Sequence, residues 1–559
     1  MQTLSGRQAL LSILEDEGVD HLFGNPGTTE LPLMDTLVDH PEIRYVVGLQ
    51  ESVAMAMADG FSRASGRLSM VNVHVAPGLG NTIGAIYNAK FFGSPVLVTA
   101  GQQEHGLSLT EPMLYDDLVK IAAPVTKWAT EVARVQDLPR TIRRAAKVAL
   151  TPPTGPVFVS LPRDVLLATA ELELGAPTRV DSSSRPHDEL LTRLADRLLA
   201  AQNPVIISGH EVYTGDAMPE LAQVAELIGA PVYTQTVPYV ALFPTEHPLF
   251  QGELTRIQAT VRRLLEPHDL LFDIGSDNLR MANPSAVEPL PPGMLIIQIG
   301  LRDWELGKNY PAELAIRAEV KQTLAALIPV LKARRSAAQA TAAGRRAQAA
   351  AERNWSVKRR RLVAKTQEQA SAKPIAPEVL MLAIADTVPK DAVIVEEGLT
   401  STRTLLNFLT ITHRQRFYGL ASGGIGFAIA GAVGIQLAVK NRPVVAVIGD
   451  GSAMYSIQAL WTAAHLKLPI TYVIANNHSY RILKERVYAL NGPAKAQDRY
   501  FGMDFRDPPI AFPALAQSLG VKAYQVTDPG ELVPTLREAL AYSGGPRLVD
   551  VHVFDGYKD

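Results

Sequence analysis

The chain has 559 residues, of which 47% are hydrophobic and 20% are charged, with a formal net charge of −2 at pH 7. This length exceeds what one hydrophobic core supports and predicts about three domains. The near-neutral charge gives no electrostatic basis for binding nucleic acid. The sequence contains no cysteine, which excludes disulfides, thiolate metal sites and a cysteine nucleophile.

The N-terminal segment carries charges within its apolar pattern, at Arg7, Glu15, Asp16 and Glu17, which is not typical of a signal peptide. No stretch of about 20 apolar residues lacks charges. We therefore expect no membrane partner and a cytoplasmic location.

The first block, over residues 1–175, alternates helices with short apolar strands. A helix is predicted over Gly6–Glu17, and strands are predicted at His21–Phe23, Arg44–Gly48, Ser69–His74 and Pro95–Thr99. This alternation favours a parallel, doubly wound sheet. The polar, proline-containing stretch Gly175–His187 that follows is typical of a linker.

The second block, over residues 188–333, repeats the pattern. It begins with a predicted helix over Glu189–Ala200 and continues with strands at Pro204–Ser208, Pro231–Tyr233, Leu270–Ile274 and Met294–Ile299. Residues 334–372 are rich in Ala, Arg, Lys and Gln and predict a helical linker, with the basic run 358–361 on its solvated face.

The third block, over residues 373–559, follows the same plan as the first and is consistent with duplication. Its predicted strands are Ala392–Val395, Val444–Ile448 and Ile470–Ala475, with a glycine-rich turn at Gly423–Gly426. The sequence therefore predicts an α/β protein with three doubly wound parallel-sheet domains.

A motif suited to a diphosphate and a metal ion lies in the third block. Gly449-Asp450-Gly451-Ser452 follows the strand Val444–Ile448, a helix is predicted at Ser456–His465, and the next strand ends at Asn476-Asn477. Asp450 and Asn477 then lie at the carboxyl ends of parallel strands, where open α/β sheets bind ligands. The glycines let the backbone approach a diphosphate, and the side-chain oxygens suit Mg²⁺ or Ca²⁺. The pair resembles the motif of thiamine-diphosphate enzymes.

Two other glycine-rich stretches, Gly78-Leu79-Gly80 and Gly424-Ile425-Gly426, are also compatible with a Rossmann dehydrogenase. Neither completes the G-x-G-x-x-G pattern, so this alternative has little support.

If the cofactor is thiamine diphosphate, a carboxylate must lie against its aminopyrimidine ring to activate the thiazolium carbon. Glu51 fits this need, because it follows the strand Arg44–Gly48 and precedes the small-residue helix Ser52–Ala58. The alternative is an acid at a helix start that complements the helix dipole. The motif in the third block favours the catalytic interpretation.

The chain also resembles the benzoylformate decarboxylases over nearly its whole length. The segments that carry the resemblance are Phe23–Pro32, Leu49-Gln50-Glu51, Val73-His74, Gly78–Asn81, Thr99–Gln103, Gly423–Ala428 and Ala459–Ala464. In that superfamily the activating glutamate and the metal motif come from different subunits. The resemblance therefore implies an obligate homodimer, more often a homotetramer.

The resemblance assigns the cofactor site residue by residue. Glu51 matches the activating acid, Asp450 and Asn477 match the metal ligands, and Ser479 matches a position that adds a backbone carbonyl. Ile425 matches the apolar residue that supports the bent cofactor, and Gly423 matches a carbonyl contact to the aminopyrimidine. The remaining implied cofactor contacts are Thr400, Gly449, Gly451, Ser452 and Tyr480.

On the substrate side, His74 matches a histidine that assists proton transfers, although a lone histidine is more often structural. Thr28 matches a serine that contacts the substrate carboxylate, with a helix cap as the alternative. The implied pocket also contains Asn25, Met113, Leu114, Leu483 and Arg486. For Met113, Leu114 and Leu483, ordinary core packing is an equal alternative.

Two departures from the family bear on the substrate. The family's second active-site histidine falls within Gly275–Pro284, where this chain has Ala282 and no histidine. Arg486, beside Lys484 and Glu485, stands where the decarboxylases have an aromatic pocket residue. Such a pocket suits a small or anionic substrate better than a phenyl ring.

The resemblance implies non-oxidative decarboxylation of a 2-keto acid, with benzoylformate or a similar arylglyoxylate as the leading candidate, to an aldehyde and CO₂. One alternative is a carboligase or lyase of the acetolactate-synthase or benzaldehyde-lyase type. Another is a catalytically silent relative that only binds the cofactor. The presence of Glu51, Asp450 and Asn477 argues against this alternative. Whether the central block binds a second nucleotide such as FAD stays open.

Overall fold

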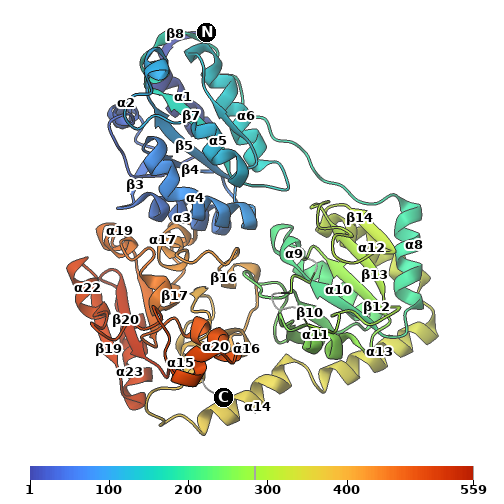
Figure 1. Cartoon of the computed structure of the whole chain (residues 1–559). Coiled ribbons are helices and arrows are strands. Elements are labelled where there is room, and N and C mark those ends of the chain that lie inside the picture. Colours follow the sequence, from blue (N-terminus) through green and yellow to red (C-terminus); the bar gives the residue numbers. More distant parts are fainter. Residues whose placement is uncertain (278, 282–284, 558–559) are drawn as a thin grey trace. The chain divides into compact units, whose positions relative to one another are not determined.

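The computed structural model describes residues 1–277, 279–281 and 285–557 (Figure 1). The chain divides into two compact units. Unit 1 comprises Met1–Val180, Ala370–Arg403 and Leu420–Asp559, and unit 2 comprises Asp181–Gln369 and Thr404–Gly419.

The N-terminal part of unit 1 contains a parallel six-stranded sheet in the order β3-β2-β4-β5-β7-β6. Its core is apolar on both faces of the sheet, as expected for parallel strands covered by helices. The strands are β2 (His21–Gly24), β3 (Arg44–Val47), β4 (Ser69–Val73), β5 (Val96–Gln102), β6 (Ala129–Glu131) and β7 (Val157–Pro162). The helices are α1 (Gly6–Asp16), α2 (Leu31–Thr36), α3 (Glu51–Ser65), α4 (Val75–Phe92), α5 (Leu118–Ala122), α6 (Leu138–Leu150) and α7 (Arg163–Leu167).

The C-terminal part of unit 1 contains parallel strands in the order β15-β17-β18-β20-β19. The strands are β15 (Val393–Glu397), β17 (Val444–Gly449), β18 (Ile470–Asn476), β19 (Lys522–Val526) and β20 (Arg547–His552). The helices are α15 (Pro377–Thr387), α17 (Ala428–Val439), α18 (Asp450–Ala453), α19 (Ala459–His465), α20 (Arg481–Ala489), α21 (Pro493–Gln497), α22 (Phe512–Ser518) and α23 (Pro529–Ala541).

Unit 2 contains a parallel six-stranded sheet in the order β11-β10-β9-β12-β13-β14. The strands are β9 (Pro204–Ser208), β10 (Val232–Thr234), β11 (Phe250–Glu253), β12 (Leu270–Ile274), β13 (Leu295–Gly300) and β14 (Leu314–Arg317), with β16 (Phe417–Gly419) in the second segment of the unit. The helices are α8 (Asp188–Ala200), α9 (His210–Thr214), α10 (Met218–Ile228), α11 (Gln258–Leu265), α12 (Val320–Arg334), α13 (Ala337–Ala351), α14 (Trp355–Gln367) and α16 (Leu405–Phe408).

Helices α3 and α17 pack directly against each other inside unit 1. A methyl group at Gly434 would overlap the carbonyl oxygen of Met57, and one at Gly60 would overlap that of Gly431. The two helices therefore meet backbone to backbone, which only residues without a side chain allow.

The predicted α/β fold with three doubly wound parallel sheets is confirmed. The sequence did not predict the small antiparallel pair of β1 (Gln2–Ser5) and β8 (Thr169–Leu172), because neither strand contains a continuous apolar run. The helix predicted at Ser456–His465 begins only at Ala459. Before it, i→i−3 hydrogen bonds such as that from Tyr455 N–H to Ser452 O form turns in its place.

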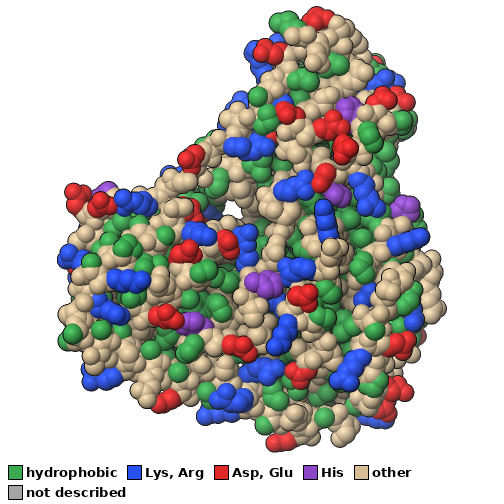
Figure 2. All heavy atoms as spheres, turned by 180° about the vertical axis from the view of Figure 1, so that it is seen from behind, with side chains coloured by type: hydrophobic (Ala, Val, Ile, Leu, Met, Phe, Trp, Pro, Cys, Tyr) green, Lys and Arg blue, Asp and Glu red, His purple; other side chains and the backbone are tan. Residues whose placement is uncertain are grey.

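The surface of the chain carries both signs of charge. On the face seen in Figure 2, Lys and Arg side chains are interspersed with Asp and Glu and form no large patch of one sign. Among the described residues, no helix has the length and apolarity needed to cross a bilayer.

Candidate active site

The predicted metal ligands lie together at the carboxyl ends of β17 and β18. The backbone N–H of Ser479 donates to Asp450 Oδ2 at 3.1 Å and to Asn477 Oδ1 at 3.0 Å, so these two oxygens converge on one donor. Asn477 Nδ2 donates to Ser401 Oγ at 3.0 Å, which turns the amide oxygen toward Asp450. Parallel pairing of the two strands, with Gly449 opposite Ala475, produces this arrangement.

Asp450 is a buried carboxylate, 3% exposed. Desolvation by burial raises its pKa to about 7, although backbone N–H groups such as that of Ser479 donate to it. Among the described residues, no Lys or Arg forms an ion pair with it. A buried carboxylate beside an amide oxygen, lacking a protein cation, fits a divalent metal ion with oxygen ligands. No cluster of three or more His, Cys, Asp or Glu that could hold a metal occurs in the part of the chain described.

Around this group, the residues expected to contact the diphosphate are buried or nearly so. Thr400, Gly451 and Ser452 are buried, and Gly449 and Tyr480 are partly exposed. A methyl group at Gly451 would lie 2.5 Å from Cε1 of Tyr480, so glycine is required there. The backbone can thus approach an anion closely at the start of α18.

The turn Gly423–Gly426 leads into α17 and is held by a carboxylate that the sequence did not single out. Gly423 and Gly426 adopt positive φ values of 85° and 113°, which favour glycine. Glu397, at the end of β15, accepts hydrogen bonds from the backbone N–H of Gly426 at 2.5 Å and of Ala428 at 2.7 Å. Burial raises the pKa of Glu397 to about 8.

In the N-terminal part of unit 1, Glu51 and His74 both lie close to Gly78. A methyl group at Gly78 would be 3.3 Å from Glu51 Oε1 and 3.5 Å from His74 Cβ. Glu51 is the first residue of α3 and accepts a hydrogen bond from Asn81 Nδ2 at 3.0 Å. His74 precedes α4 directly.

The predicted substrate residues divide into several groups in the structure. Thr28 is exposed and Asn25 partly exposed, in the turn between β2 and α2. Met113 is 84% exposed and Leu114 is 38% exposed, so neither is an ordinary core residue. Among described contacts, no hydrogen bond or ion pair joins Glu51 or His74 to the Asp450 group.

The other predicted pocket residues, Leu483 and Arg486, lie on α20 and are exposed. Ile425, predicted to support the cofactor, is partly buried in the turn before α17. Their neighbours are ion-paired, since Lys484 contacts Asp504, and Glu485 contacts Arg403 at 3.0 Å. Ala282, which replaces the family's second histidine, lies outside the described residues.

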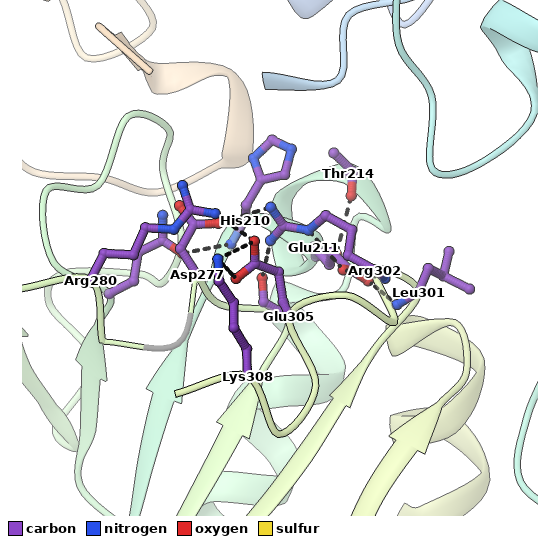
Figure 3. Close-up of polar contacts among 11 residues, drawn as sticks. His210, Glu211, Thr214, Asp277, Arg280, Leu301, Arg302, Glu305 and Lys308 are labelled. Atoms are coloured by element: carbon purple, nitrogen blue, oxygen red, sulfur yellow. Dashed lines mark hydrogen bonds and ion pairs between the residues drawn. The ribbon is translucent and has the colours of Figure 1, made fainter. Parts of the chain in front are cut away.

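The central sheet carries a separate polar cluster at the carboxyl ends of its strands (Figure 3). Glu211 accepts hydrogen bonds from the backbone N–H of Leu301 at 2.6 Å and of Arg302 at 3.2 Å. Arg302 also donates to Asp277 Oδ1 at 2.8 Å. Glu211, Arg302 and Asp277 thus pair with one another at this edge of the sheet.

Three residues of the site were missed by sequence reasoning: Glu30, Ser401 and Glu397. Glu397 stands opposite Ile448 in the parallel register, at the same sheet edge as Asp450. Like Asp450 and Asn477, Glu397 lies at the carboxyl end of a parallel strand, and this position is the signal in the sequence that points to it. Glu30 was within the quoted segment Phe23–Pro32, but its contact to His74 is visible only in the tertiary structure.

Comparison with known proteins places this arrangement in a family. Family models for the thiamine pyrophosphate (thiamine diphosphate) enzymes match three segments: the N-terminal binding domain over residues 4–120, the central domain over 191–327 and the C-terminal binding domain over 400–551. The chain is 34% identical over 547 residues to a benzoylformate decarboxylase of Pseudomonas aeruginosa, covering 97% of this chain and 98% of that protein. It is 26% identical to an acetolactate synthase large subunit of Haemophilus influenzae, with 99% and 95% coverage.

Solved structures agree with the sequence comparison. A thiamine diphosphate-dependent 4-hydroxybenzoylformate decarboxylase of Rhodococcus jostii superposes with a TM-score of 0.87 at 30% identity, over 99% of this chain and all of that chain. A benzoylformate decarboxylase of Polynucleobacter necessarius gives a TM-score of 0.87 at 28% identity over the whole of both chains. The chain therefore belongs to the family of thiamine-diphosphate-dependent enzymes that includes the benzoylformate decarboxylases.

Proposed function

We propose that the protein is a thiamine-diphosphate- and Mg²⁺-dependent decarboxylase that converts an arylglyoxylate such as benzoylformate to an aldehyde and CO₂. The observation that carries the proposal is the buried pair of oxygens on Asp450 and Asn477, which both accept from Ser479 N–H. Among the described residues, no Lys or Arg forms an ion pair with Asp450 to balance its charge. The sequence identity of 34% to a benzoylformate decarboxylase, over 97% of this chain, supports an arylglyoxylate as the substrate class.

The roles proposed for the residues follow from their chemistry. Asp450, Asn477 and the Ser479 carbonyl would hold the metal ion, and Glu51 would contact the aminopyrimidine ring. When bound, thiamine diphosphate supplies the electron sink that accepts the electron pair left by departing CO₂. His74 would carry a proton to or from the reacting carbon, and Thr28 would bind the substrate carboxylate.

A carboligase of the acetolactate-synthase type is the second candidate. Arg486 on α20 is charged and exposed, which suits a small or anionic substrate, and the acetolactate synthases match the chain over nearly its whole length. A catalytically silent relative is less well supported, because Glu51, Asp450 and Asn477 are all present.

The test is to supply the protein with thiamine diphosphate and Mg²⁺ and to measure CO₂, aldehyde and acyloin from benzoylformate and from pyruvate. CO₂ with benzaldehyde supports the decarboxylase, and CO₂ with acetolactate or an acyloin as the main product supports the carboligase. Cofactor binding without turnover of either acid would indicate the silent relative.

We further propose that the protein assembles as a homodimer or, more often in such enzymes, a homotetramer, and that it is cytoplasmic. Residues 1–175, 188–333 and 373–559 are the proposed pyrimidine-binding, central and diphosphate-binding domains. Sedimentation at several protein concentrations tests the assembly state.

A further inference from the structure

His74 is held by a buried carboxylate. Its Nδ1 lies 2.7 Å from Glu30 Oε2 and 3.1 Å from the Thr29 hydroxyl. The Glu30 side chain is 1% exposed, whereas the His74 side chain is 23% exposed. One edge of the imidazole is thus fixed inside the protein, and part of the ring reaches the surface.

Both carboxyl oxygens of Glu30 accept hydrogen bonds from neighbouring N–H and O–H groups. Oε2 accepts from the backbone N–H of Gly27 at 2.9 Å, and Oε1 accepts from that of Gly101 at 2.9 Å and from the Thr29 hydroxyl at 2.7 Å. The Glu30 oxygens thus act as acceptors throughout, and the Thr29 hydroxyl uses its hydrogen on Oε1. His74 Nδ1, which faces Oε2, is therefore the donor, which leaves Nε2 as the nitrogen that can exchange a proton with a ligand.

The backbone around the pair is shaped to fit it. A methyl group at Gly27 would overlap Cγ and Nδ1 of His74, and one at Gly101 would overlap Oε1 of Glu30. The Tyr45 hydroxyl is also buried near Gly24, and burial, with the charge of Glu30, raises the pKa of Tyr45, so that it stays neutral. The imidazole therefore has one orientation, and its Nδ1 hydrogen bond is protected from water.

We propose that Glu30 is a positioning residue for proton transfer: it fixes the orientation and the Nδ1–H tautomer of His74, so that Nε2 faces the reacting carbon. This rests on the proposed function, in which His74 handles the proton. The proximity of both Glu51 and His74 to Gly78 supports it, because the cofactor-activating acid and the proton-transfer group would then lie in one active site.

The test compares Glu30→Gln with Glu17→Gln. Glu17 is a matched control, since its side chain is also 1% exposed in the same domain but pairs with Arg143 and Arg179 at 2.7 Å, away from His74. We expect Glu30→Gln to lower kcat by about 10- to 100-fold, as losses of orienting partners do, with little change in KM and with a displaced pH profile. Glu17→Gln should change stability only.

A second measurement does not depend on turnover. Solid-state ¹⁵N spectra of histidine-labelled holoenzyme, assigned with His74→Asn, should show a protonated Nδ1 in the wild type and a mixed or reversed tautomer in Glu30→Gln. If Glu30→Gln does not fold, Glu30→Asp replaces it. This variant keeps the carboxylate on a shorter side chain, and it should lower kcat by less than the roughly 10- to 100-fold expected for Glu30→Gln.

Unchanged kcat, pH profile and His74 signal in the Glu30 variant would overturn the inference. A wild-type enzyme that turns over neither benzoylformate nor pyruvate, yet shows the tautomer change, would instead contradict the proposed function and leave the positioning contact established.

Discussion

Gly434 of α17 lies so close to the carbonyl oxygen of Met57 in α3 that no side chain fits between them. This contact joins the helix that begins at Glu51 to the helix that follows the turn Gly423–Gly426. The proposed pyrimidine-side and diphosphate-side elements of one chain are therefore connected through rigid backbone.

The first prediction concerns this contact. Gly434→Ala should lower the free energy of unfolding by about 1–3 kcal/mol, because overpacking forces the helices apart. Urea unfolding followed by circular dichroism measures it. Gly344→Ala is the control, since Gly344 lies in helix α13 with open space around it, and alanine there should be neutral or stabilising by up to about 1 kcal/mol. Equal effects of the two substitutions would contradict the backbone contact.

The second prediction concerns the pH dependence of metal binding. The pKa of Asp450 is raised to about 7 by burial, and only the ionised carboxylate binds a cation. Mg²⁺-dependent binding of thiamine diphosphate should therefore strengthen by about tenfold per pH unit from pH 5 to 7 and level off above. Calorimetric titration at several pH values measures it.

Asp450→Asn provides the control for that titration. Because its amide does not ionise, binding to the variant should be weak at every pH and should not vary with pH in this range. Wild-type affinity that is the same at pH 5.5 and pH 8 would argue against Asp450 as a metal ligand.

The third prediction concerns Glu51. Glu51→Gln should reduce turnover by about 10²- to 10⁴-fold, the range for loss of a general acid–base group. Binding of Mg²⁺ and thiamine diphosphate should persist, because Asp450 and Asn477 are unchanged. Stopped-flow assay of CO₂ release and a parallel cofactor titration separate the two effects. Full activity in the variant would exclude Glu51 as the activating acid.

The fourth prediction concerns Glu397, whose pKa is raised to about 8 by burial. A raised carboxyl pKa contributes stability that is present at low pH and is lost as pH rises from about 4.5 to about 8. The side chain in Glu397→Gln stays neutral at every pH. The free energy of unfolding of this variant, relative to that of the wild type, should therefore rise steadily as pH increases over that window. Thermal unfolding of both cofactor-free proteins at pH 5 and pH 8.5 tests this, and a difference that does not vary with pH would refute it.

Sequence patterns predicted much of the fold. The strands at Leu270–Ile274 and Pro204–Ser208 were predicted with their exact bounds, because buried parallel strands form short, continuous apolar runs. The strands β1 and β8 were missed, since neither contains a continuous apolar run and most of their residues are exposed or only partly buried.

For the site, the sequence predicted what depends on position along a strand and missed what depends on tertiary contacts. Asp450 and Asn477 follow adjacent parallel strands, so their proximity could be deduced. Glu30 and His74 are 44 residues apart, and their hydrogen bond depends on how β2, β4 and their loops pack. Nothing in the spacing of those residues indicates the contact.

If Asp450 binds the metal ion as proposed, the amount of this protein in a cell should depend on the supply of metal and cofactor. A ligand that binds only the folded chain stabilises it by about 2.7 kcal/mol at 100 times its Kd. Folded chains without metal and cofactor lack this stabilisation, and they should unfold more often into forms that proteases remove. A cell short of thiamine or magnesium should therefore hold fewer copies of this protein, and should recover them only by new synthesis.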